Sequence, residues 1–155
     1  GKRFTFHDSC KHGRELARNY GKGYFDEPRW IINQCVDEFV ELTPNREKNF
    51  CCGAGGGLWP MRFEDESAWH GRYKHEQINA SGADVVVVGC SNCRDQIMKR
   101  IPKYYPEARY EVKYLWQLVA ESLIIEPWPE HLAEQSRQEA REQWERWGID
   151  PNAEY

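Results

Sequence analysis

Four consecutive valines, residues 85–88, constrain the fold of this chain more than any other part of its sequence. A strand with an apolar side chain at every position is buried on both faces, which is typical of the middle of a parallel sheet covered by helices. Two further strand patterns stand on either side of it in the sequence, at residues 3–7 and 110–114. Helical patterns separate the three strands, and this alternation predicts an α/β fold, a parallel sheet with flanking helices.

The predicted helices occupy residues 14–20, 29–36, 66–81, 95–101 and 115–123, residues 38–42 are expected to form a short strand, and residues 102–106 a loop. In the longest of these helices, Trp69, Tyr73 and Ile78 recur about a turn apart and are expected on one face. Gly82 is placed to end this helix in the left-handed conformation.

A change of composition near residue 126 divides the chain in two. Residues 1–125 carry the alternating pattern and are expected to form a cysteine-rich domain, and residues 126–155 a helical C-terminal tail. Within the tail, residues 130–147 predict a charged helix that either packs back on the domain or docks a partner helix. Because the chain begins inside a strand pattern, we expect a domain cut from, or paired with, something larger.

The charge of the chain argues against one class of partner. Its net charge is -4 and its isoelectric point about 5.8, whereas a protein that binds the phosphate backbone of nucleic acids needs a basic face. No apolar run approaches the roughly 20 residues needed to cross a bilayer. We therefore expect a cytoplasmic domain that binds no nucleic acid and associates with a membrane only through partner subunits.

Six cysteines require a chemical explanation in a chain of 155 residues. Disulfide frameworks usually belong to shorter chains that lack a core, and this chain is long enough to bury one. Metal ligation or thiol redox chemistry is therefore the favoured explanation. Cys35 is the exception, because it shares the apolar face of a predicted helix with Trp30 and Ile32 and is expected to be a small core residue.

Three of the other cysteines are expected at one edge of the sheet. Cys90 and Cys93 are separated by two residues and follow the valine strand at the start of a helix, and Cys10 follows the first strand. Ligands of open parallel sheets collect beyond the carboxyl ends of the strands. A Cys-x-x-Cys pair in this place can bind one metal centre or act as a reversible dithiol.

Cys51 and Cys52 are adjacent and stand before a glycine-rich run that begins with Gly53. Adjacent sulfurs diverge, yet both can reach a polynuclear centre, and the glycines let the backbone approach it closely. Five thiolates exceed the four ligands of a structural zinc ion. An iron–sulfur cluster is therefore the favoured cofactor, with zinc as the alternative.

Two other functions remain open on the sequence alone. One is a metal-free thiol–disulfide oxidoreductase that uses Cys90 and Cys93. The other is a zinc-binding interaction module that does no chemistry. Replacement of Cys51 separates the first of these from a cluster protein, because that change should destroy a cluster and barely affect a Cys90–Cys93 dithiol.

Three segments carry a resemblance to a known family: residues 6–10 (FHDSC), 49–57 (NFCCGAGGG) and 89–93 (GCSNC). In this order, they resemble the cysteine-rich CCG domain of heterodisulfide reductase catalytic subunits, which also occurs in glycolate-oxidase iron–sulfur subunits. Within this family, the chain most resembles the K subunit of the membrane complex linked to dissimilatory sulfite reductase. The resemblance spans about residues 3–123 and implies a Rossmann-like domain. It departs from the common motif at Ser9, where the family usually has proline.

The resemblance implies a non-cubane [4Fe–4S] cluster and a heterodisulfide-reductase-like oxidoreductase. Its reaction would reduce or form a disulfide or trisulfide of a small sulfur-carrier protein, or a low-molecular-weight disulfide. Electrons are expected from other subunits or domains of a redox complex. The implied cluster ligands are Cys10, Cys51, Cys52, Cys90 and Cys93, with Gly53 beside them.

Two histidines flank the first of these cysteines. His7 and His12 are candidates to supply protons near neutral pH. A capping or packing role is the favoured alternative for both.

Overall fold

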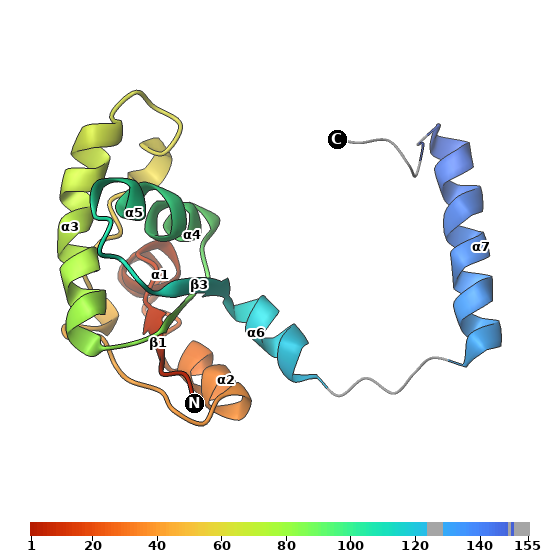
Figure 1. The fold of residues 1–155 in the computed structure, drawn as a ribbon, viewed down its shortest axis with the longest axis horizontal. Helices are drawn as coiled ribbons and strands as arrows, with labels where there is room; N and C mark the ends of the chain where they lie inside the picture. Colours follow the sequence, from red (N-terminus) through yellow and green to blue (C-terminus); the bar gives the residue numbers. More distant parts are fainter. Residues whose placement is uncertain (124–128, 149, 151–155) are drawn as a thin grey trace. The chain divides into compact units, whose positions relative to one another are not determined.

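A three-stranded parallel sheet lies at the centre of residues 1–123 in the computed structural model (Figure 1). Its strands β1 (Phe4–His7), β2 (Val85–Val88) and β3 (Glu111–Tyr114) stand in the order β1-β2-β3. All four valines of β2 are inaccessible to solvent, as expected of a central strand that is covered on both faces. The predicted parallel α/β fold is confirmed.

The structure describes residues 1–123, 129–148 and 150, and the chain divides into two units, residues 1–123 and 124–155. The predicted boundary between residues 125 and 126 lies outside the described residues. Each unit is therefore considered by itself.

Helices and turns connect the strands of the first unit. In chain order they are a π-helical turn (Lys11–Glu15), α1 (Leu16–Tyr20), α2 (Asp26–Cys35), two 3₁₀ turns (Arg46–Lys48 and Gly55–Gly57), α3 (Glu64–Ser81), α4 (Ser91–Asp95), a second π-helical turn (Gln96–Arg100), α5 (Ile101–Tyr104) and α6 (Leu115–Ser122). Gly82 ends α3 in the left-handed conformation, as predicted.

Helices cover both faces of the sheet, and the side-chain alternation along β2 assigns each valine to one face. On the first face, Val86 and Val88 belong to a core that includes Ile78 of α3 and residues of the helix after β2. On the second face, Val87 packs in a separate core with Ile32 of α2 and with residues of α6. The sheet is thus the middle layer of three.

The helix after β2 is longer than predicted. It begins at Ser91, directly after Cys90, and runs through α4, the π-helical turn and α5 to Tyr104. The prediction of a loop at residues 102–106 is therefore wrong for residues 102–104, which belong to α5. Proline lacks a backbone N–H, and Pro102 is accommodated because it occupies the first turn of α5, directly after the π-helical turn.

The short strand expected at residues 38–42 is not present. Only Phe39 forms a bridge, to Phe4 of β1. Two backbone hydrogen bonds hold this bridge, from Phe4 to the Glu38 carbonyl and from Val40 to the Phe4 carbonyl, each 2.9 Å or shorter. The segment therefore covers the edge of the sheet without extending it.

The aromatic side chains of two helices lie on the surface, contrary to the prediction. Trp69 and Tyr73 of α3 and Trp30 of α2 are all about half exposed or more. The buried face of α3 is instead built from small and polar residues, among them Gly71 and Lys74. A prediction from hydrophobicity alone therefore places the wrong residues on the buried face of α3.

The second unit contains α7 (Glu130–Trp147), which agrees with the predicted charged helix and ends at Gly148 in the left-handed conformation. None of its described residues is buried. Across the part of the chain that the structure describes, no helix combines the length and apolar character needed to span a membrane.

A buried ion pair fixes the segment that follows β1. Arg29 of α2 donates two hydrogen bonds to the carboxylate of Asp8, at 2.7 and 2.9 Å, and two more to Glu41, at 2.6 and 2.8 Å. Burial opposes the charge of Arg29, but these carboxylates outweigh it and raise its pKa. Asp8 is thereby held between His7 and the turn that carries Cys10.

We expect Arg29→Met to lower the free energy of unfolding by about 3–5 kcal/mol, because it leaves the Asp8 carboxylate buried without its cation. Urea unfolding monitored by circular dichroism measures this change. Lys22→Met is the matched control, since Lys22 pairs with Glu27 in full contact with solvent and should leave the transition nearly unchanged. Equal effects of the two substitutions would contradict a structural role for the buried pair.

Candidate metal centre

The carboxyl ends of β1 and β2 lie side by side, because His7 pairs in register with Val88. Cys10 follows β1 after Asp8 and Ser9, and Cys90 follows β2 after Gly89. Both cysteines therefore leave the sheet at the same edge. The alternation of side chains also places His7 on the face of Val88, toward the core that contains α3.

Three buried side chains form the centre of the site. Donor atoms of His7, Cys52 and Cys93 all lie within 4.8 Å of one another. The Sγ atoms of Cys52 and Cys93 are 3.3 Å apart and share a hydrogen bond. Each of the three side chains belongs to a different segment: the end of β1, the Cys-Cys-Gly loop and the first turns of α4.

Three more thiols surround this centre. Cys51 is exposed, and its Sγ accepts a hydrogen bond of 3.4 Å from the backbone of Gly53. Cys90 is half-buried at the start of α4 and forms a hydrogen bond with Cys93. Cys10 is also half-buried and lies close enough to feel the charge of Cys52. None of these cysteines forms a disulfide.

Because the thiols lie close together, the pKa of some is lowered and the pKa of others is raised. Hydrogen bonds from Cys51 and Cys93, and from His7, hold the pKa of Cys52 well below its usual value. The bond to Cys52 in turn raises the pKa of Cys51 and of Cys93. A hydrogen bond from Cys93 lowers the pKa of Cys90 to about 6, although burial opposes it. The arrangement thus favours the thiolate of Cys52 and of Cys90 and disfavours that of Cys51 and of Cys93.

The Cys-Cys-Gly loop rests directly on the backbone of α3. A side chain at Gly53, where φ is +90°, would meet the Ser67 carbonyl oxygen at 2.5 Å and the Gly71 nitrogen at 2.8 Å. Ser67 also donates a hydrogen bond of 2.9 Å to the Gly53 carbonyl. Glycine at position 53 therefore permits the close approach that buries Cys52.

A buried polar chain lies beside the thiols. Lys74 of α3 is inaccessible to solvent and donates to Asn49 Oδ1 at 2.7 Å and to Gln77. Asn49 in turn directs its Nδ2 to the Asp8 carbonyl at 2.9 Å and to His7 Nδ1 at 3.2 Å. Burial lowers the pKa of Lys74 to about 7, against the attraction of the nearby thiols.

This chain of hydrogen bonds assigns the proton of His7. Lys74 Nζ donates to Asn49 Oδ1, and an ammonium group can only donate, so Asn49 presents its oxygen to Lys74 and its N–H groups to the other side. His7 Nδ1 is then an acceptor, and the neutral ring carries its proton on Nε2. Nε2 has no hydrogen-bond partner among the described residues, and a donor atom of the ring lies within 4.8 Å of the sulfurs of Cys52 and Cys93. Burial, together with Lys74, lowers the pKa of His7 and keeps the ring neutral.

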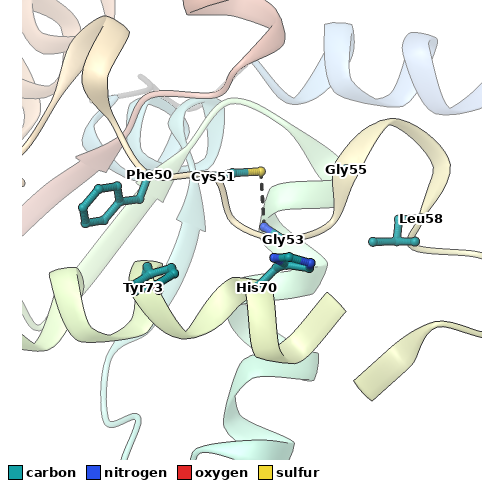
Figure 2. Close-up of a pocket in the computed structure, with 7 residues that line it drawn as sticks. All are labelled: Phe50, Cys51, Gly53, Gly55, Leu58, His70 and Tyr73. Carbon is teal, nitrogen blue, oxygen red and sulfur yellow. Dashed lines mark hydrogen bonds between the residues drawn. The ribbon is translucent and has the colours of Figure 1, made fainter. Parts of the chain in front are cut away.

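A pocket opens at the exposed side of the site (Figure 2). It measures about 350 Å³ and is almost entirely apolar. Figure 2 shows Phe50 and Cys51 on one side of it and His70 and Tyr73 of α3 on the other. Cys51 is the cysteine that a molecule in this pocket would meet first.

The structure separates the remaining candidates from the centre. His12 lines a second pocket of about 350 Å³, with Ser9 and Trp116, at the carboxyl edge of the sheet. Cys35 packs against the core of the second face, as expected. Sequence reasoning missed Lys74, although a signal was available: Gly71, Lys74 and Ile78 recur at helical spacing on the buried face of α3.

The donor set fits an iron–sulfur cluster. Thiolates are the ligands that such clusters select, and five unpaired cysteine thiols meet here or lie beside the buried pair. His7 Nε2–H supplies a hydrogen-bond donor for a sulfur ligand, and Gly53 leaves room for the loop to close around the centre.

Fold and site together define a cysteine-rich α/β domain whose thiols gather at one edge of its sheet. The chain belongs to the CCG cysteine-rich domain family, whose model matches residues 4–98 and therefore contains all five thiols of the site.

Its relatives include named oxidoreductases. The chain is 33% identical, over 57% of its length, to an EtfAB:quinone oxidoreductase of Syntrophomonas wolfei. It is 32% identical over 77% to the probable iron–sulfur-binding oxidoreductase FadF of Bacillus subtilis. It is 29% identical over 81% to a component of the dihydromethanophenazine:CoB–CoM heterodisulfide reductase of Methanosarcina mazei. The chain spans only 11%, 16% and 29% of these three proteins.

We expect Gly53→Ala to destabilise the metal-free protein by more than about 1 kcal/mol, because the left-handed backbone and the contact with α3 both oppose a side chain. Urea unfolding measures the effect. Gly21→Ala is the control, since Gly21 is also left-handed, with φ +78°, but a side chain there meets nothing within 4 Å. If both substitutions had the same small effect, the close approach of the loop to α3 would be unnecessary.

Proposed function

We propose that this chain is the cluster-binding domain of a heterodisulfide-reductase-like iron–sulfur oxidoreductase. The observation that carries the proposal is the convergence of thiols from three separate segments on the buried pair of Cys52 and Cys93, whose sulfurs are 3.3 Å apart. In this proposal a non-cubane [4Fe–4S] cluster is held by these two residues together with Cys10, Cys51 and Cys90.

The reaction that fits the site is the cleavage or formation of a disulfide or trisulfide. Cleavage of a disulfide consumes two electrons and two protons and yields two thiols. A bound cluster supplies electrons one at a time. The residues of this chain would hold the cluster and shape its surroundings: the apolar pocket at Cys51 would admit the substrate, and the buried chain of His7, Asn49 and Lys74 would exclude water from the interior.

The histidines have different parts in this proposal. His7 is buried and neutral and donates its Nε2 proton to a sulfur ligand, so it orients and stabilises thiolate and does not deliver protons. His12 lines the second pocket and is the candidate for proton delivery at the sheet edge.

This chain spans only a small share of the length of its relatives, so further subunits or domains are proposed as its partners. Other subunits or domains of a redox complex would supply the electrons, and any association with a membrane would occur through them. The substrate would be a small sulfur-carrier protein or a low-molecular-weight disulfide. A place in the branch linked to dissimilatory sulfite reductase remains part of this proposal.

Anaerobically purified protein should contain roughly four irons and four acid-labile sulfides per chain, the content of a [4Fe–4S] cluster. Colorimetric iron and sulfide analysis measures the content, and paramagnetic resonance of the oxidised sample reports the cluster type. Cys51→Ser should lose most of the iron, because it removes one thiolate. Cys35→Ala, which alters a core cysteine, should retain it. A wild-type protein without iron or sulfide would refute the proposal.

One observation favours a second candidate, a mononuclear zinc site. The buried set of His7, Cys52 and Cys93 could bind a single ion, with a fourth ligand from a neighbouring thiol. It would require a lone pair on His7 Nε2, where the hydrogen-bond pattern places a proton. A zinc site would give one zinc per chain and no sulfide, and the same metal analysis decides between the two.

The metal-free dithiol is tested by labelling. With a pKa of about 6, Cys90 should be alkylated by iodoacetamide at a rate that rises through pH 6 and levels off above it, since the thiolate is the nucleophile. Mass spectrometry of the metal-free protein measures the rate. Protein as purified should be protected at Cys90 if a cluster occupies it and fully reactive if the protein functions as a free dithiol.

A further inference from the structure

Lys74 is the most unusual buried group in this structure. Its side chain is inaccessible to solvent, and among the described residues no carboxylate forms an ion pair with it. Its contacts are two neutral amide oxygens, Asn49 Oδ1 and Gln77 Oε1. A buried ammonium group without a counter-charge destabilises a folded protein, and such groups usually become neutral or are replaced.

The nearest carboxylate is already engaged. Asp8 acts on Lys74 electrostatically, but its two oxygens accept hydrogen bonds from Arg29 at 2.7 and 2.9 Å. Asp8 shares this one cation with Glu41, so its charge is only partly offset, but among the described residues its oxygens form no hydrogen bond with Lys74. The other negative groups that act on Lys74 are the thiols of the candidate centre, Cys52 first, followed by Cys93 and Cys51.

We propose that Lys74 is the fixed counter-charge of the thiolate-bound centre: from the buried side it offsets the negative charge of the sulfur ligands and raises the reduction potential of the bound group. The inference rests on the proposed function, because it needs a centre that gains electrons. Lys74 is a positioning residue, since Asn49 separates it from His7 and its hydrogen bonds within the described chain go to amide oxygens, not to sulfur.

The position of Lys74 on α3 supports this role. Gly71, one turn before it, is the point where the Cys-Cys-Gly loop meets the helix. The spacing of three residues places Lys74 on the same buried face of α3. Helix α3 thus provides both the backbone that the Cys-Cys-Gly loop contacts and the lysine that lies beside the thiols. A long aliphatic stem lets the ammonium group reach Asn49 through the core.

The same residue also orders the hydrogen bonds of the site. Its bond to Asn49 Oδ1 turns the amide so that Nδ2 faces His7 and Asp8. This orientation places the proton of His7 on the nitrogen that serves the sulfur. The charge of Lys74 and the orientation of these hydrogen bonds therefore have the same effect. Both stabilise the thiolate ligands and the electron that the centre gains on reduction.

The test compares Lys74→Met with Lys99→Met in the anaerobically purified protein. Met matches the length of lysine and removes the charge, and Lys99 is an exposed lysine whose loss changes the net charge equally. Midpoint potentials are measured by redox titration followed by paramagnetic resonance. At a fixed potential, Lys74→Met should lower the reduced-to-oxidised ratio about tenfold, a shift of about -59 mV for a one-electron couple.

A second measurement separates a charge effect from damage to the fold. In metal-free protein, Lys74→Met should unfold in urea at the same or a higher concentration than the wild type, because it removes an unpaired buried charge. The iron-loaded variant should nevertheless lose its iron to a chelator faster than wild type. A purely structural lysine would give the opposite sign in the metal-free protein and leave the potential unchanged, which would overturn the inference.

Lys74→Gln is the second variant, because it keeps a hydrogen-bond donor for Asn49 while removing the charge. The same negative shift in Lys74→Gln supports the counter-charge, whereas a wild-type potential in this variant overturns it. A wild-type protein that binds no iron refutes the proposed function itself. Wild-type protein with a cluster whose potential responds equally to substitution of Lys74 and Lys99 refutes only the present inference.

Discussion

The contact between the Cys-Cys-Gly loop and the backbone of α3 is the constraint on which the site depends. Gly53 approaches the helix so closely that a single methyl group would collide with the Ser67 carbonyl and the Gly71 nitrogen. This approach buries Cys52 and brings its sulfur to that of Cys93, which arrives independently from the end of β2. The sheet contributes the second half of the arrangement, because its parallel register aligns the ends of β1 and β2. Neither half alone would bring the thiols together.

The site is electrostatically asymmetric. On the buried side, Lys74, Asn49 and His7 form a chain of hydrogen bonds beside the sulfurs, in surroundings closed to solvent. On the open side, Cys51 faces an apolar pocket. In a medium of low dielectric, charges and dipoles act more strongly than they do near solvent. In the proposed function, the buried side would therefore set the acidity and potential of the centre, and the open side would receive the reactant.

The sequence predicts the sheet and the edge where the cysteines gather, because both follow from local patterns. Four adjacent valines specify a doubly buried strand, and a cysteine directly after a parallel strand must lie at its carboxyl end. The buried face of α3 does not follow from such a pattern. There, Ser67 and Lys74 are buried and Trp69 is exposed, because the loop approaches the helix backbone closely where hydrophobicity would place an aromatic residue. This constraint comes from the loop, which is separate in sequence from the helix.

The hydrogen-bond chain from Lys74 to His7 bears on the nature of the centre. A charged lysine cannot accept a hydrogen bond, so in this form it fixes the orientation of Asn49, and Asn49 fixes the proton of His7 on Nε2. An imidazole held in this form is suited to donate to a thiolate and poorly suited to bind a metal through the same nitrogen. In the proposed function, sulfur would therefore be the ligand and the histidine would stabilise its charge. A centre bound by cysteines alone would then account for a histidine that is buried beside the thiols at the end of β1 without being a ligand itself.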